Sequence, residues 1–119
     1  MSCPVVQWQI VTRNAEAAAA FYRDAFGWKI TTGNALGYRQ VDTGAGGMKG
    51  GLWPSPPDSP SLVQLFIAVP DVERAVGDAT RLGAKIIVPT TTLPDGDVMA
   101  ILLDPAGISF GIVRATAVD

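Results

Sequence analysis

The sequence predicts an α+β protein made of two βαβββ units that follow one another along the chain. Three observations support this class. The chain contains an internal repeat, each copy starts with a strand-like segment followed by a helix-like segment, and three more strand-like segments follow each helix. The repeat is clearest in Gly-X-Lys-Ile, which begins at Gly27 and again at Gly83. We therefore expect a single domain over residues 1–119, with units at 4–54 and 62–114 and a linker at 55–61.

Each predicted helix follows a residue that can cap it. Asn14 and Asp71 have side-chain oxygens that accept hydrogen bonds from the free N–H groups of a first helical turn. Gly27 and Gly83 are expected to end the helices, because glycine adopts the left-handed conformation at little cost. Apolar spacing predicts the buried faces, which are Ala18, Phe21, Tyr22, Ala25 and Phe26 in the first helix and Val72, Ala75, Val76, Ala79 and Leu82 in the second.

The other elements are predicted as short strands separated by turn residues. Glycine-rich segments, among them the run at 44–47, interrupt the strands, and the prolines between the two units exclude a central strand there. The expected strands are 5–11, 29–33, 37–42 and 48–53 in the first unit and 62–69, 85–93, 98–103 and 109–113 in the second.

Composition excludes several classes of function. The chain is 48% hydrophobic, yet no apolar run reaches the ~18 residues of a membrane span. A net charge of -2, with dispersed cations, is unsuited to binding nucleic acid phosphates. Cys3 is the single cysteine, so no internal disulfide can form, and no signal peptide is visible at the N-terminus. We therefore expect a cytoplasmic protein.

The sequence contains no histidine, and this restricts its chemistry most strongly. Catalytic triads, histidine general bases and histidine-containing metal sites are all excluded. One cysteine is also too few for a thiolate zinc site within a single chain.

Several short motifs, in this order and spacing, resemble those of the vicinal-oxygen-chelate superfamily. That superfamily includes glyoxalase I, extradiol dioxygenases and the fosfomycin and bleomycin resistance proteins. The resemblance covers essentially the whole chain and implies half-barrel sheets around a pocket, often in a homodimer. The motifs are Ala19-Ala20-Phe21-Tyr22, Phe26-Gly27-Trp28, Val69-Pro70-Asp71-Val72-Glu73-Arg74-Ala75-Val76, Leu82-Gly83-Ala84 and Asp104-Pro105-Ala106-Gly107.

The resemblance also locates the positions at which the superfamily holds a divalent metal ion. These positions correspond to Gln7, Leu65, Gly111 and a residue near Gly51 or Leu52. Among them Gln7 alone has a side-chain oxygen, and one neutral oxygen does not hold a catalytic metal. The chain is thus expected to be a member that lacks the metal ligands, with no metal and no other cofactor.

The candidate ligand-binding residues come from the predicted pocket faces. Strand alternation places Gln7 and Gln9 together, with Trp8 on the opposite face. The glutamines could bind a ligand, or they could bond to each other, to neighbouring strands or to water. Glycines at 50, 51 and 111 favour an open pocket over a filled barrel. The full set is Gln7 and Gln9, Leu65, Ile67 and Gly111 on an apolar wall, and Tyr38, Trp53 and Met99 as a stacking surface, the aromatic members also being suited to a core or dimer interface.

These residues predict a metal-independent small-molecule binding protein of the glyoxalase/bleomycin-resistance type. It would sequester an apolar or aromatic metabolite or antibiotic, act as a homodimer and bind neither nucleic acid nor membrane. No catalytic residue is identified. One alternative is a metal-free isomerase or lyase that uses acid or base residues other than histidine, and a carboxylate with a raised pKa inside the pocket would distinguish it. A dimerisation or accessory module is the other, and it would have a filled barrel.

Overall fold

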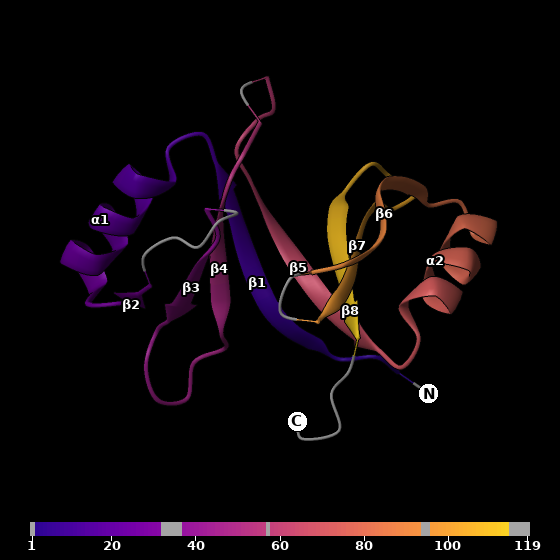
Figure 1. The fold of residues 1–119 in the computed structure, drawn as a ribbon, viewed down its shortest axis with the longest axis horizontal. Helices are drawn as coiled ribbons and strands as arrows, with labels where there is room; N and C mark the ends of the chain where they lie inside the picture. The colour runs from indigo at the N-terminus through magenta and orange to yellow at the C-terminus, as the bar shows by residue number, and fades with distance from the viewer. Residues whose placement is uncertain (1, 32–36, 57, 94–95, 115–119) are drawn as a thin grey trace. The chain divides into compact units, whose positions relative to one another are not determined.

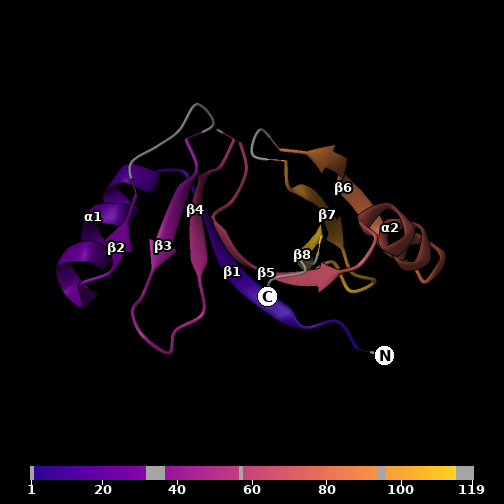
Figure 2. The same cartoon turned by 60° about the horizontal axis from the view of Figure 1, so that its bottom comes forward.

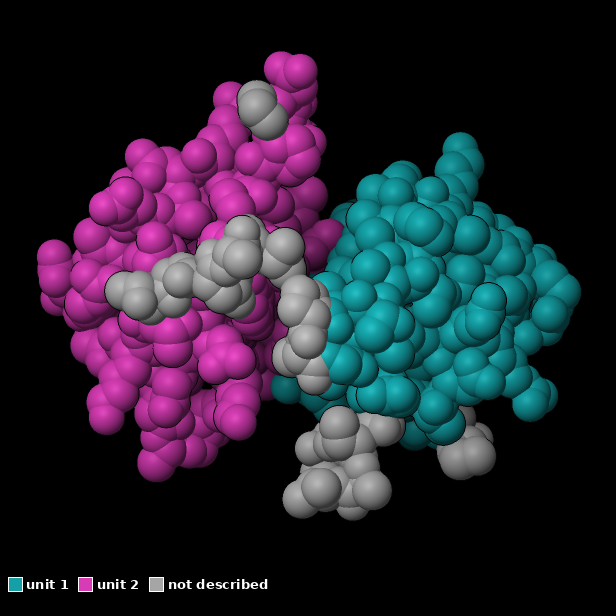
Figure 3. Space-filling model, viewed as in Figure 1, with its two compact units in different colours: residues 1–6, 65–119 teal, residues 7–64 magenta. Residues whose placement is uncertain are grey.

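The computed structural model describes residues 2–31, 37–56, 58–93 and 96–114 of the 119-residue chain. Within this part of the chain the order strand, helix and three strands occurs twice (Figure 1). The α+β class and the two βαβββ units are thus confirmed. The chain divides into two compact units, residues 7–64 and residues 1–6 with 65–119 (Figure 3). The elements are β1 (Val5–Thr12), α1 (Ala15–Phe26), β2 (Lys29–Ile30), β3 (Arg39–Asp42), β4 (Gly50–Pro54), β5 (Leu62–Val69), α2 (Val72–Arg81), β6 (Lys85–Thr92), β7 (Val98–Leu103) and β8 (Ser109–Arg114).

The unit of residues 7–64 contains four strands in the order β2-β3-β4-β1. β1 runs parallel to β4, and β3 is antiparallel to both β2 and β4 (Figure 2). Its core consists of Ala19, Val41 and Leu52, with Trp8 and Ile10 packed against them. The α1 helix therefore covers one face of these strands.

The other unit repeats this arrangement with strands in the order β5-β8-β7-β6. β5 is parallel to β8, and β7 is antiparallel to both β6 and β8. The core under α2 includes Val72, Val76 and Leu102. Neither α1 nor α2 is long and apolar enough to cross a membrane.

The predicted caps begin both helices. Asn14 Oδ1 accepts the N–H of Ala17 at 2.9 Å, and Asp71 Oδ1 accepts the N–H of Arg74 at 3.1 Å. Gly27 ends α1 in the left-handed conformation, with φ of 71°. The second helix differs slightly from the prediction, because Leu82 is its C-terminal cap and the left-handed Gly83 follows it.

The predicted buried faces of the helices are wrong at their largest residues. Phe21 and Phe26 are 59% and 63% exposed, and Leu82 is 81% exposed. The buried residue of α1 is Ala19, whose small side chain brings the helix close to the sheet. The sheet supplies the large core side chains instead, such as Leu52 and Trp8, so the helix's own aromatic residues are not needed to fill the core.

Candidate functional site

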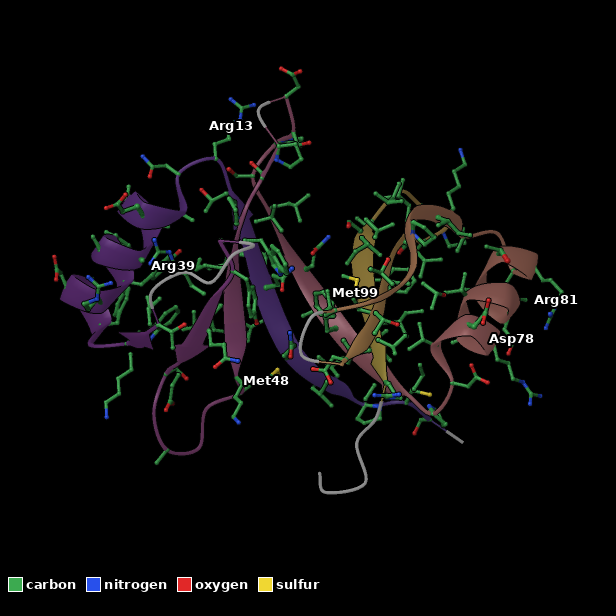
Figure 4. The ribbon with its side chains drawn as sticks, viewed as in Figure 1. Arg13, Arg39, Met48, Asp78, Arg81 and Met99 are labelled. Atoms are coloured by element: carbon green, nitrogen blue, oxygen red, sulfur yellow. The ribbon has the colours of Figure 1, made fainter. Side chains whose placement is uncertain are left out.

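A polar face of the sheet lies on the side of the first unit opposite α1. Along β1, Trp8 and Ile10 pack into the core under α1, as alternation predicts. Gln7 and Gln9 therefore lie on the opposite face. Arg39 lies on the other face, the one that α1 covers, because it is two residues from the core residue Val41 on the same strand. Figure 4 shows it on the side of α1, and its Nη1 donates a hydrogen bond to Thr31 O at 3.5 Å. We name the surface opposite α1 the amide face, after its glutamines.

Strand register arranges the amide face in rows. Gln9 pairs with Gly51 on β4, and Gly51 pairs with Gln40 on β3, so two carboxamides flank one glycine. Gln40 continues the row to Thr31, because its N–H donates to Thr31 Oγ1 at 2.9 Å. Each glutamine carboxamide has an oxygen that accepts hydrogen bonds and an NH₂ group that donates them. This row can therefore bind both donor and acceptor groups of a ligand.

A neighbouring row contains the charged residues. Lys29 on β2 pairs with Asp42 on β3. The same registers, continued by one residue, place Lys49 beside Asp42 and Gln7 beside Lys49. This row thus contains two ammonium groups, one carboxylate and one carboxamide across four adjacent strands.

Two aromatic rings lie at the other end of the amide face. The Tyr38 ring covers Gly51, since a Cβ atom built on Gly51 would be 2.5 Å from Tyr38 Cε1. The centroid of this ring is 4.7 Å from that of Trp53, with a 38° angle between the planes. A planar ligand could stack beside these rings and bond to the amides.

The amide face lines a cavity of about 450 Å³, a volume suited to a small organic molecule. The predicted residues Gln7 and Tyr38 line it. Gln9 is only 4% exposed and lies in the adjacent row, and Trp53 contacts the cavity's Tyr38. The lining residues are Gln7, Lys29, Ile30, Thr31, Tyr38, Gln40, Val41, Asp42, Lys49 and Gly50.

Sequence reasoning missed the polar residues on β2 and β3. Gln40 and Asp42 follow Tyr38 at intervals of two, so alternation from a residue already chosen could have found them. Lys29 and Lys49 could not be found in this way, because their approach to Asp42 depends on how three strands pair.

In the second unit, the predicted apolar wall is assigned to the wrong face of β5. Ile67 packs against the core under α2, whereas Phe66 packs on the opposite face with Met99 and Ile101. Leu65 is 52% exposed. Leu65 lies six residues before the helix cap Asp71, whereas Gln7 lies seven residues before the helix cap Asn14. The residue seven positions before Asp71 is the buried Gln64.

Three glycines that favoured an open pocket instead make room for aromatic rings. A Cβ atom on any of them would lie within 2.5 Å of ring carbon. The prediction of empty space at these glycines is therefore wrong, because the neighbouring ring occupies it. The pairs are Gly50 with Trp8, Gly51 with Tyr38, and Gly111 with Phe66.

The metal positions implied by the superfamily do not fit a metal ion in this chain. Gly51 and Gly111 lack a donor and are covered by rings, Leu52 is buried in the core, and Leu65 is apolar. Gln7 offers one neutral carboxamide oxygen, and the position seven residues before the second helix cap adds that of the buried Gln64. Neutral amide oxygens without a charged or imidazole ligand do not make a catalytic metal site. No cluster of three or more histidine, cysteine, aspartate or glutamate side chains able to hold a metal occurs among the described residues.

Most of the chain matches the model of one protein family. The model of the glyoxalase-like domain matches residues 7–113. The chain belongs to this family and, with it, to the vicinal-oxygen-chelate superfamily.

Among particular proteins, the chain is 28% identical over 111 residues to the protein named "Putative glyoxylase CFP32" of Mycobacterium tuberculosis. The Mycobacterium bovis protein of the same name matches equally. The match covers 87% of this chain and 42% of the relative, so the chain spans about two fifths of the length of these curated relatives.

Solved structures share the fold. A hypothetical protein of Bacillus halodurans superposes with a TM-score of 0.68 at 16% identity, covering 98% of this chain and 96% of the other. A Streptomyces coelicolor methylmalonyl-CoA epimerase variant, bound to 2-nitronate-propionyl-CoA, gives 0.65 at 20% identity, covering 98% and 100%. At these identities the likeness concerns the fold alone.

Proposed function

We propose that this chain is a small-molecule binding protein that holds its ligand on the amide face without a metal ion. The observation that carries the proposal is the cavity of about 450 Å³, whose lining includes the carboxamides of Gln7 and Gln40 and the ring of Tyr38. Such a cavity combines a few placed polar groups with an aromatic surface, as ligand sites commonly do. An aromatic metabolite or antibiotic with polar substituents would suit both features.

The position of Gln9 supports the proposal. Gln9 is 4% exposed and shares its face of β1 with Gln7, which lines the cavity. It pairs with Gly51, and Gly51 pairs with the cavity residue Gln40. The Gln9 carboxamide thus belongs to the same row as the Gln40 carboxamide and can offer a ligand both a donor and an acceptor.

The second unit is less suited to this role. The face of its sheet opposite α2 is filled by Phe66, Met99 and Ile101, with Val88, Leu93 and Val113 around them. An apolar cluster of this kind stabilises the unit but offers no polar recognition. We therefore propose Gln7, Gln9, Tyr38 and Trp53 as ligand contacts and assign Met99 and Gly111 to packing.

The comparisons are consistent with this proposal. The curated relatives carry the name "Putative glyoxylase CFP32", and the epimerase structure is a complex with 2-nitronate-propionyl-CoA. We propose that this chain also binds a small organic molecule.

Native mass spectrometry of gently purified protein is the first test. It reports subunit number, bound metal and retained organic molecules in one spectrum. We expect a dimer with an added organic mass and no metal, and we expect Gln7→Leu to lose the organic mass. A stoichiometric divalent ion would contradict the metal-free proposal.

A thermal-shift screen of aromatic compounds and antibiotics is the second test. A ligand that binds only the folded state stabilises it by RT ln(1 + [L]/Kd), so binders should raise the Tm of the wild type more than that of Gln7→Leu. Failure of every compound to raise Tm would favour an accessory module with no ligand.

A further inference from the structure

Three residues of the charged row line two cavities. Lys29, Asp42 and Lys49 line the cavity of about 450 Å³, and the same three residues line a second cavity of about 470 Å³. The second cavity is formed by the loop between β3 and β4, and its lining is completed by Gly27, Thr43, Gly44, Ala45 and Gly47. One elongated molecule could therefore occupy both.

The charges in this row are unbalanced. Two of the three lysines in the chain flank a single carboxylate, that of Asp42. Asp42 is also engaged elsewhere, since its Oδ1 accepts the N–H of Gly44 at 2.9 Å. The part of the chain that the structure describes contains one ion pair, between Arg81 and Asp78 on α2 (Figure 4). Neither Lys29 nor Lys49 therefore forms an ion pair with Asp42.

We propose that the ligand carries an anionic group, a carboxylate or a phosphate, held by Lys29 and Lys49. This inference rests on the proposed function and names the class of ligand. The polar and aromatic part of the ligand would lie on the amide face beside Tyr38. Its anionic part would extend over the lysines toward the loop of residues 43–47, in which Gly44 and Gly47 carry no side chain.

The second repeat lacks this arrangement and provides a control. Lys85 occupies the position of Lys29 in the Gly-X-Lys-Ile repeat, but it pairs with Leu103, and Leu103 pairs with Ser109. A second ammonium group is therefore not provided across those strands. The paired lysines distinguish the first unit, as expected if they serve its cavity.

The test uses NMR titration of the full chain with phenyl phosphate, benzoate and benzamide, which share one ring and differ in charge. The wild type should bind the two anions more tightly than benzamide. Lys29→Met and Lys49→Met should each weaken anion binding about threefold, and the double variant about tenfold, with benzamide unaffected. Lys85→Met should retain wild-type affinities.

Salt provides a second readout. Raising NaCl from about 50 mM to about 500 mM should weaken anion binding in the wild type but not in the double variant. Comparing phenyl phosphate with benzoate identifies which anion the site prefers. An anion preference that persists in the double variant would overturn the inference.

The probes also separate this inference from the proposed function. Equal binding of all three probes on the amide face would overturn the anion site and leave the proposed function intact. The absence of shifts at Gln7, Gln40 and Tyr38 with every probe would overturn both.

Discussion

The ring of Tyr38 stands where a side chain at position 51 would otherwise be. Its Cε1 and hydroxyl oxygen would lie 2.5 and 2.6 Å from a Cβ atom on Gly51. The Tyr38 ring can occupy this place because residue 51 is glycine, and any larger residue there would displace the ring.

Gly51→Ala should lower the free energy of unfolding by about 1–3 kcal/mol and abolish ligand binding, since the Tyr38 ring must move. Urea denaturation and a binding titration measure the two effects. Gly77→Ala on α2 is the matched control, because a Cβ there meets nothing within 4 Å. It should be neutral or stabilising, by up to ~1 kcal/mol, through helix propensity. Equal losses from both substitutions would refute the steric argument.

Gln9→Met should leave Tm unchanged or raise it while weakening ligand binding about tenfold. The substitution keeps the volume of a side chain that is 4% exposed but removes its amide. Thermal unfolding and titration with a binder from the screen measure these effects. Gln64→Met is the control, because Gln64 is the other buried glutamine but lies on β5 and not in the row that joins Gln9 to the cavity residue Gln40. This substitution should leave affinity unchanged. A large loss of Tm in Gln9→Met with normal binding would show that Gln9 is structural.

Removing the cap of either helix should weaken the fold without altering the site. Asn14→Ala and Asp71→Ala each leave a first-turn N–H without its acceptor and should lower the free energy of unfolding by about 1 kcal/mol. Chemical denaturation measures this. Asn14→Ser restores a capping oxygen and should recover most of the loss, whereas no recovery would mean that the cap is not the cause.

Two substitutions on α2 test which face of that helix is buried. Val76→Ala removes methyl groups from the core under α2 and should lower the free energy of unfolding by about 1–3 kcal/mol. Leu82→Ala should change it by less than about 0.5 kcal/mol, because Leu82 is 81% exposed. A comparable loss at Leu82 would indicate that another surface covers this residue, for example in a dimer.

Chelation tests the metal-free proposal. Treatment with EDTA, followed by removal of the chelator, should leave both Tm and ligand affinity unchanged, because the implied metal positions offer no donor beyond neutral carboxamide oxygens. Thermal unfolding before and after treatment measures the effect. A drop in Tm that added Zn²⁺ or Mn²⁺ restores would contradict the proposal.

Local sequence determined which elements form and where the two helices begin. Asn14 and Asp71 cap the helices because their short side chains reach N–H groups three residues away, and such contacts need no distant partner. Alternation likewise assigned Gln7 and Gln9 to the face opposite Trp8, because successive side chains of any strand point to opposite sides. The missing histidines and the repeat were also visible before any folding.

Tertiary structure alone decided what those faces meet. Glycines at 51 and 111 are compatible with an open pocket or a covering ring, and only strand pairing places Tyr38 and Phe66 over them. The row of Lys29, Asp42 and Lys49 has the same origin, because residues far apart in the chain become neighbours through register. The alternation of residues along a strand predicts which face of the sheet a side chain lies on. The pairing of strands determines which side chains are its neighbours, and the chemistry of the site depends on those neighbours.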